Sequence, residues 1–343
     1  MNYGNTPGNI KCTMHLLLTL LILAACNPDE KDIQPIPSNN PASGIQEDIG
    51  ISQPTVTQHP FSETENAVEI VVGHIRGGKV TEKNVEVALE TAGLTKDGKT
   101  PFTVTFVPGA TSIDEHAFFE CTSLTGVVIR EGINMIGGFA FLNCTSLTSV
   151  ELPASVDYID PYAFWVCPSL TDISVDSDNP HFMSESHVLF NKGKTTLVRY
   201  PGGRSGTYSI PDGTVSIRSG AFQGSALTGV AIPDSVTTIE RRAFQDCILL
   251  TDVMIPKSVT LIPQYAFAYC TSLRDLDIPD NVKAIDTLAF WLCTSLTRIV
   301  IPASVTDIDK EAFEGCEPLV IYGDTDSAAH TYAKENGMPF KFI

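Results

Sequence analysis

The segment QYAFAYCTSL, residues 264–273, decides the fold because close variants of it return along the chain. Two of these are PYAFWVCPSL at 161–170 and TLAFWLCTSL at 287–296. Eight Ala-Phe pairs occur, at 117–118, 140–141, 163–164, 221–222, 243–244, 266–267, 289–290 and 312–313. They are spaced by 22 or 23 residues, with one step of 58. Self-similarity at a fixed period indicates a repeat architecture.

A cysteine follows the Phe by three residues in seven of the eight units, and Ser225 takes this place in the other. The seven are Cys121, Cys144, Cys167, Cys247, Cys270, Cys293 and Cys316. A nucleophile needs an activating base, and a metal needs converging ligands, so copies on a structural period suit neither role. Disulfides between neighbouring coils are disfavoured because parallel side chains rarely converge. We expect a ladder of small buried thiols, with no catalytic residue, no metal and no cofactor.

A second segment alternates with the first. LTSVELPASVDYI at 147–159 returns as LTDVMIPKSVTLI at 250–262 and LTRIVIPASVTDI at 296–308. Its apolar residues alternate with polar ones as in a half-buried strand, and the proline then ends that strand. A unit of 23 residues cannot bury its own apolar side, but stacked units can. The Ala-Phe segment is interpreted as a short helical turn on the opposite side.

The combined pattern C-x-x-L-x-x-I-x-I-P-x-x-V-x-x-I-x-x-x-A-F-x-x-C resembles the BspA-like leucine-rich repeats of bacterial surface proteins. The resemblance covers about residues 109–322 and implies a leucine-rich-repeat solenoid of eight coils with short stacked parallel strands, capped at both ends. It also implies adhesion to host proteins, glycans or other cells.

The remaining segments of the body predict two caps and one insert. Residues 67–108 form the predicted N-terminal cap, with a helix over 81–94 that begins at Thr81 and a strand over 102–107. The predicted C-terminal cap, 323–343, holds a helix over 326–337 that begins at Asp326 or Ser327 and stops at Gly337. The 58-residue step carries a hairpin insert near 176–210, which is interpreted as structural, with a partner-contacting loop as the alternative.

The first residues are predicted to be a targeting signal rather than part of the folded domain. The apolar run from Met14 ends in Leu23-Ala24-Ala25-Cys26 and is too short for a membrane-spanning helix. This ending resembles the lipobox of bacterial lipoproteins, which implies a signal peptide at 1–25 and a lipid on Cys26. An ordinary secretory signal is the alternative. Residues 26–66 lack apolar periodicity and predict a disordered tether.

Charge and composition exclude one class of partner. The chain has 40 acidic and 22 basic side chains, a net charge of −18. A nucleic-acid-binding protein needs lysine and arginine to displace counterions from phosphate, so no nucleic-acid partner is expected.

His181 and His187 share the insert with Asp176 and Asp178, and this group is interpreted as a solvated loop, with a weak cation site as the alternative.

Two surfaces are candidates for binding a partner. On the predicted sheet, Asp252, Asp275 and Asp277 point outward and form an acidic patch, with an ordinary solvated face as the alternative. In the Ala-Phe turns, aromatic side chains are expected to be at least partly exposed and to contact a partner or stack on sugar, with packing between turns as the alternative. These are Trp165, Trp291, Tyr162, Tyr265 and Tyr269.

Together with these observations, the two resemblances imply a non-catalytic, adhesin-like binding protein, anchored in the outer membrane by lipid at Cys26 and exposed on the cell surface. Its ligand is a protein or a glycan. The alternatives are a periplasm-facing scaffold in an envelope complex and, less favoured, a glycan-handling accessory protein. Exposure at the surface separates the first two hypotheses.

Overall fold

A computed structural model describes residues 67–73, 76–317 and 319–343 of the chain. The predicted signal peptide and the lipidation residue Cys26 lie outside the described residues, as does the tether up to residue 66. Among the residues that are described, no helix has the length and apolar character needed to cross a bilayer.

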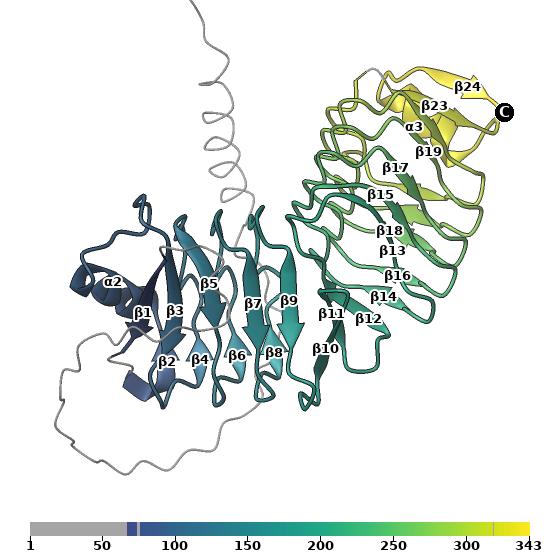
Figure 1. The fold of residues 1–343 in the computed structure, drawn as a ribbon. Helices are drawn as coiled ribbons and strands as arrows, with labels where there is room; N and C mark the ends of the chain where they lie inside the picture. The colour runs from purple at the N-terminus through teal and green to yellow at the C-terminus, as the bar shows by residue number, and fades with distance from the viewer. Residues whose placement is uncertain (1–66, 74–75, 318) are drawn as a thin grey trace, which may run out of the picture. The chain divides into compact units, whose positions relative to one another are not determined.

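The body is a parallel β-solenoid in which each coil contributes one longer strand to one side. Successive longer strands pair in parallel within each sheet, and Figure 1 shows the first five side by side in chain order. They are β1 (Val68–Val72), β3 (Phe102–Phe106), β5 (Leu124–Val128), β7 (Ser149–Leu152) and β9 (Asp172–Val175). The later ones are β13 (Gly206–Ser209), β15 (Leu227–Ala231), β17 (Asp252–Met254), β19 (Asp275–Asp277), β21 (Arg298–Val300), β23 (Val320–Gly323) and β24 (Phe340–Phe342).

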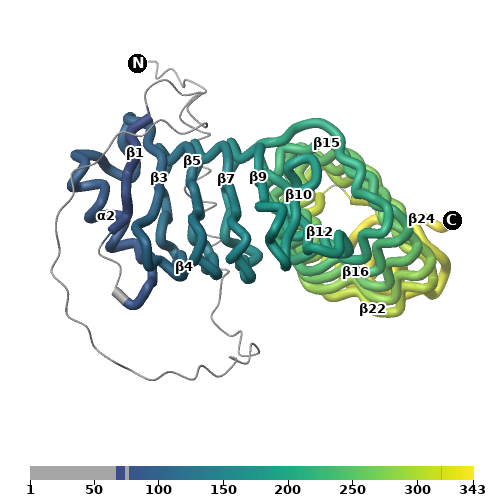
Figure 2. The backbone as a smooth tube through the Cα atoms, turned by 60° about the horizontal axis from the view of Figure 1, so that its bottom comes forward, coloured from purple at the N-terminus to yellow at the C-terminus, as the bar shows by residue number. Residues whose placement is uncertain are grey.

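Most coils also contribute a two-residue strand after the turn that ends the longer strand. These strands pair in parallel with those of neighbouring coils. Figure 2 shows the coils from β15 onward following nearly the same path. The short strands are β2 (Lys79–Val80), β4 (Ser112–Ile113), β6 (Met135–Ile136), β8 (Tyr158–Ile159), β14 (Ser216–Ile217), β16 (Thr238–Ile239), β18 (Leu261–Ile262), β20 (Ala284–Ile285) and β22 (Asp307–Ile308).

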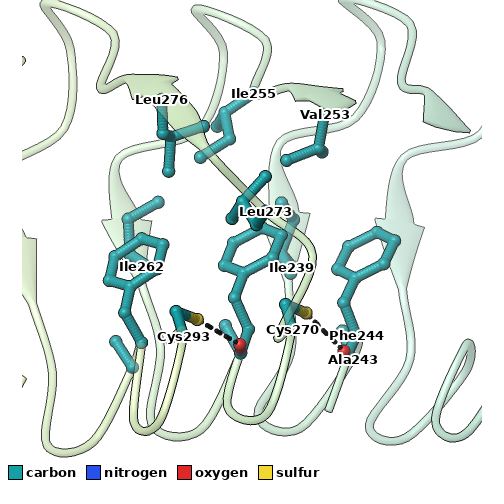
Figure 3. Close-up of a cluster of buried hydrophobic side chains, with 14 of the residues drawn as sticks. Ile239, Ala243, Phe244, Val253, Ile255, Ile262, Cys270, Leu273, Leu276 and Cys293 are labelled. Carbon is teal, nitrogen blue, oxygen red and sulfur yellow. Dashed lines mark hydrogen bonds between the residues drawn. The ribbon is translucent and has the colours of Figure 1, made fainter. Parts of the chain in front are cut away.

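The repeated Phe side chains stack inside the solenoid. All eight are at most 1% exposed, and neighbouring rings lie nearly parallel, with Phe244 and Phe267 centroids 5.2 Å apart at 1°. The backbone locks the same turns together, since Phe267 N–H donates to the Ala289 carbonyl at 2.8 Å. Figure 3 shows part of this column, including Phe244, beside Ile262, Leu273 and Leu276. The repeated sequence is therefore a packing device.

The Ala-Phe segments are hydrogen-bonded turns rather than the expected short helical turns. The residue before each repeat cysteine, or before Ser225, has a positive φ in all eight units. Most residues before the Ala do so as well, for example Tyr265 at 57°. A helix cannot continue through left-handed residues, so each coil closes with a tight non-helical turn.

Val166 is a poor residue for this turn. Its φ is 53°, and a β-branched side chain is disfavoured in the left-handed region. Asn143 occupies the same place one coil earlier, with φ 60°. We expect Val166→Asn to raise the free energy of unfolding by about 1 kcal/mol, and the reverse change Asn143→Val to lower it by a similar amount. Urea denaturation of both variants checks this, and a loss of stability in Val166→Asn would contradict it.

The 58-residue step contains a complete additional coil with a hairpin, in the predicted region. β10 (Phe182–Glu185), β11 (Val188–Asn191) and β12 (Thr196–Arg199) are antiparallel neighbours, and β12 then pairs in parallel with β14. Arg199-Tyr200 replaces Ala-Phe here, since Tyr200 N–H donates to the Ala221 carbonyl as a repeat Phe would. The solenoid has about ten turns in all, because this coil and the strands of the N-terminal cap add to the eight turns counted from Ala-Phe pairs.

Both predicted cap helices are present. α2 (Glu82–Thr91) follows Thr81, whose backbone N–H donates to Asn84 Oδ1 at 2.9 Å. It is preceded by the 3-10 helix η1 (Arg76–Gly78). α3 (Ala328–Glu335) follows Ser327, whose side chain accepts from His330 N–H at 3.2 Å. Gly337, with φ 65°, lies just beyond its end, as predicted.

Candidate functional site

The cysteine ladder is structural. All seven thiols are buried and free, and six of them donate to a Phe carbonyl of the preceding coil, as Cys270 does to Phe244 at 3.2 Å (Figure 3). Burial raises the pKa of Cys121 and Cys167 to about 12. A thiol of that pKa holds almost no thiolate at neutral pH, so these side chains are poor nucleophiles.

No group of three His, Cys, Asp or Glu side chains that could hold a metal occurs in the described part of the chain. Polar side chains of the insert instead make contacts that hold the turn between β10 and β11, residues 186–187. His187 Nδ1 lies 2.7 Å from Asp172 Oδ1, and Arg204 bonds to the Ser186 carbonyl. Lys194, in the turn between β11 and β12, pairs with Glu185 at the end of β10. These contacts support the structural interpretation of the insert.

The predicted acidic patch lies on the exposed face of the longer strands. Asp252, Asp275 and Asp277 are all exposed, on the neighbouring strands β17 and β19. Met254 stands among them with 78% of its surface exposed. Arg298 pairs with Asp277 at 2.7 Å and so neutralises part of the patch.

A column of threonines borders this face and is structural. Their hydroxyls donate to carbonyls one coil back, for example from Thr251 to Thr228 at 3.0 Å and from Thr148 to Thr125 at 2.9 Å. The column therefore reinforces the stacking of coils, and the variable positions beside it are the ones available to a partner.

Trp165 is buried, which corrects the expectation that it is exposed. It is 3% exposed and lies against Phe139 of the preceding coil, with ring centroids 5.7 Å apart, and against Tyr162, at 6.3 Å. Tyr162 is half-buried and stacks on Phe139, which in turn stacks on His116. Trp165 follows its Ala-Phe pair and is covered by Tyr162 and Phe139, which each precede the Ala of their unit. Packing between adjacent turns therefore explains why Trp165 is buried.

The second aromatic group is only partly accessible. Tyr269, expected to be exposed, is 7% exposed and meets Trp291 edge to face at 4.7 Å. Trp291 and Tyr265 are half-buried, with centroids 6.3 Å apart. The Arg242 guanidinium lies 4.5 Å from the Tyr265 ring centroid, a cation–π contact. Thus the structure brings Tyr265, Tyr269 and Trp291 together but separates them from Trp165.

Sequence reasoning missed a polar cluster beside these rings. Gln223 and Gln245 are buried where other coils have Leu142 or Ala268, and Asp246 follows Gln245. Burial raises the pKa of Asp246 to about 7, against the opposing effects of the Gln223 and Gln245 amides and of the Arg242 charge. The available signal was the change from apolar to polar residues at one position of the repeat.

The raised pKa of Asp246 predicts a pH-dependent stability. The unfolded chain releases this proton near pH 3.8, whereas the folded protein holds it to about pH 7, so stability falls as pH rises between these values and is flat above them. Asp246→Asn removes the charge and tolerates the φ of 59°. We expect the Asn variant to exceed the wild type by about 2 kcal/mol at pH 8 and to match it near pH 4. Urea denaturation at the two pH values measures this, and a difference that is independent of pH would contradict it.

A second missed residue, Arg199, joins two coils from within. It is 3% exposed, and its guanidinium donates to the carbonyls of Phe164, Gly220 and Gln223 at 2.8, 2.6 and 3.2 Å. In the two preceding coils, the equivalent Phe carbonyl accepts from a cysteine thiol. Burial lowers the pKa of Arg199 to about 10, so it remains charged at neutral pH. A buried cation is thus used where the cysteine ladder is interrupted.

Comparison with known proteins supports the repeat interpretation. A family model described as "BspA type Leucine rich repeat region" matches residues 101–199 and 205–320, in six copies. A leucine rich cell surface protein of Faecalibacterium prausnitzii is 28% identical, with a TM-score of 0.54 over 68% of this chain and 75% of that one. The pneumococcal vaccine antigen PcpA is 22% identical, with a TM-score of 0.57 over 72% of this chain and 74% of that one, and shows the same fold. No curated protein matches the chain.

Proposed function

Because the chain belongs to the BspA type leucine rich repeat family, we propose that it is a non-catalytic, adhesin-like binding protein of the bacterial surface, recognising a protein, a glycan or another cell. The 28%-identical relative is itself a cell surface protein, which supports this location. The Leu23-Ala24-Ala25-Cys26 segment, which resembles a lipobox, favours a lipid anchor in the outer membrane.

The observation that carries the proposal is the contrast between the two kinds of side chain in a coil. The repeated Leu, Ile, Ala, Phe and Cys side chains are buried, whereas the outward-facing positions of β17 and β19, which differ from those of other coils, are exposed. On β17 and β19 these positions hold Met254 with Asp252, Asp275 and Asp277. An exposed apolar side chain ringed by charge suits contact with a partner.

The acidic surroundings select the chemistry of that partner. Carboxylates at the rim of an interface attract a basic surface and speed association at low salt. We therefore propose that this face binds a protein segment rich in lysine or arginine. Arg298, paired with Asp277, leaves Asp252 and Asp275 as the freer carboxylates.

A triple variant, Asp252→Ala with Asp275→Ala and Asp277→Ala, tests this face. Binding of the full-length protein to immobilised extracellular-matrix proteins should weaken on the order of tenfold, with a smaller dependence on salt. The matched control removes the same charge from the exposed Pro-Asp turns, as Asp212→Ala, Asp234→Ala and Asp280→Ala. Equal losses in both triples would mean that net charge, not this face, governs binding.

A further inference from the structure

One coil of the solenoid carries an unusual share of the exposed apolar side chains. Eleven large apolar side chains are exposed in the described part of the protein, and four of them lie in the single coil that contains residues 247–262. They are Ile248 at 47%, Leu249 at 46%, Met254 at 78% and Leu261 at 40% exposed. Single apolar side chains on a surface are ordinary, but a concentration of them marks an interaction site.

Ile248 and Leu249 stand where other coils have threonine and serine. Four coils share the sequence Cys-Thr-Ser-Leu, at 121–124, 144–147, 270–273 and 293–296. The serine there has a structural use, since Ser272 Oγ donates to the Ile248 carbonyl of the preceding coil at 2.6 Å. By contrast, residues 247–250 read Cys-Ile-Leu-Leu, which gives up these hydroxyls and exposes two aliphatic side chains to water. Packing of the repeat does not explain this exchange, so it points to a partner that covers the two side chains.

Leu249 and Met254 lie at the two ends of a row that follows β17. Asp252 is exposed between them on the same strand. The preceding strand β15 (Figure 1) places only small residues beside this row, since Gly229 pairs with Asp252 and Ala231 with Met254. A chain that lies over β15 would therefore reach the side chains of the row without a bulky neighbour in its way.

Two carboxylates select the charge of that chain. Asp252 and Asp275 occupy the same place on the successive strands β17 and β19. Neither forms an ion pair with a described residue, whereas Asp277 pairs with Arg298 at 2.7 Å. Arg274 is exposed next to Asp275, so a basic side chain of the partner fits best over Asp252. A lysine or arginine placed there would meet a complementary charge.

We propose that this coil docks an extended partner segment of the form apolar-x-basic-x-apolar. Alternate residues of an extended chain face the same way, so the three side chains of such a segment span about 13 Å. The row from Leu249 to Met254 is five residues long, roughly 16 Å of extended chain, and the reach of the side chains covers the difference. One apolar side chain would meet Ile248 and Leu249, the other Met254, and the basic one Asp252. The inference rests on the proposed binding role of the acidic face and names the form of the segment bound there.

Fluorescence anisotropy of labelled nine-residue peptides with the full-length protein tests the proposal. The probe peptide has the core Leu-Thr-Lys-Thr-Leu. One matched peptide has serine in place of both leucines, and another has glutamate in place of the lysine. We expect the probe to bind and each replacement to weaken binding about tenfold, because the first removes both apolar anchors and the second reverses the charge.

The decisive variant gives this coil the common sequence of the repeat, as Ile248→Thr with Leu249→Ser. Its hydroxyls can donate to the Ser225 carbonyl as Ser272 donates to Ile248, so it should resist urea at least as well as the wild type. It should bind the probe peptide about tenfold more weakly, because the apolar contact at one end of the segment is lost.

Leu261→Thr is the matched control. It removes another exposed leucine of the same coil, but from β18 rather than from the row along β17. Thr238 holds the same place on β16 one coil earlier, so the control should fold. We expect it to bind the probe peptide as the wild type does, whereas Met254→Ala should weaken binding.

The proposal is overturned if the leucine and serine peptides bind equally, if Ile248→Thr with Leu249→Ser leaves binding unchanged, or if Leu261→Thr loses as much binding as that variant. Should this happen while the aspartate triple variant still weakens binding to matrix proteins, the acidic face stands and only the form of the segment is refuted. If the triple variant binds matrix proteins as the wild type does, the proposed function of the face fails instead.

Discussion

Phe267→Ala should lower the free energy of unfolding by about 3–5 kcal/mol, because it removes a fully buried ring from the middle of the core. The Phe267 ring lies between Phe244 and Phe290, with centroids 5.2 and 5.4 Å away, so the cavity would open between two rigid neighbours. Each coil packs only against its two neighbours, so the lost packing would weaken the interfaces on both sides of this coil.

Urea denaturation followed by circular dichroism measures this effect. Met254→Ala is the matched control, since 78% of Met254 is exposed and its removal should change stability by less than about 0.5 kcal/mol. If the two variants lost equally little stability, the inward assignment of the Ala-Phe pairs would be wrong.

Arg199→Ala should cost a similar amount, about 3–5 kcal/mol, for a different reason. The truncation leaves the carbonyls of Phe164, Gly220 and Gln223 without their buried donor and opens a cavity between two coils. Arg199→Lys should recover little, because an ammonium cannot reproduce the planar guanidinium that reaches all three carbonyls.

The exposed Arg274 supplies the control, and Arg274→Ala should leave stability within about 0.5 kcal/mol of the wild type. Thermal and urea unfolding of the three variants checks the account. Wild-type stability in Arg199→Lys would show that charge, rather than the fork of hydrogen bonds, holds the two coils.

The fold was predictable because the same physical demand repeats in every coil. The Phe column, the cysteine ladder and both cap helices follow from spacing and from capping residues such as Ser327. The additional coil escaped the count because Arg199-Tyr200 serves in place of Ala-Phe, and only the three-dimensional pairing reveals it.

The candidate binding residues were less predictable, because their exposure depends on neighbours one coil away. Asp252, Asp275 and Asp277 are exposed as expected, since alternation along a strand fixes which side faces out. Trp165 and Tyr269 are buried, since the left-handed turns pack side chains of adjacent coils over them. Asp246 was missed because its unusual environment is made by Gln223 and Gln245 of different units.

The positions of these residues distinguish the structural role of the repeat from the binding role of the protein. The repeated residues build a rigid interior, and function is left to the residues that differ between coils. The acidic sheet face and the buried polar cluster of Gln223, Gln245 and Asp246 are two such departures.

Treatment of intact cells with protease tests the central proposal, a binding protein on the outer surface, most directly. The account predicts that added protease cleaves the protein while a periplasmic marker protein stays intact. Protection of the protein until the outer membrane is opened would contradict the account and favour a scaffold that faces the periplasm.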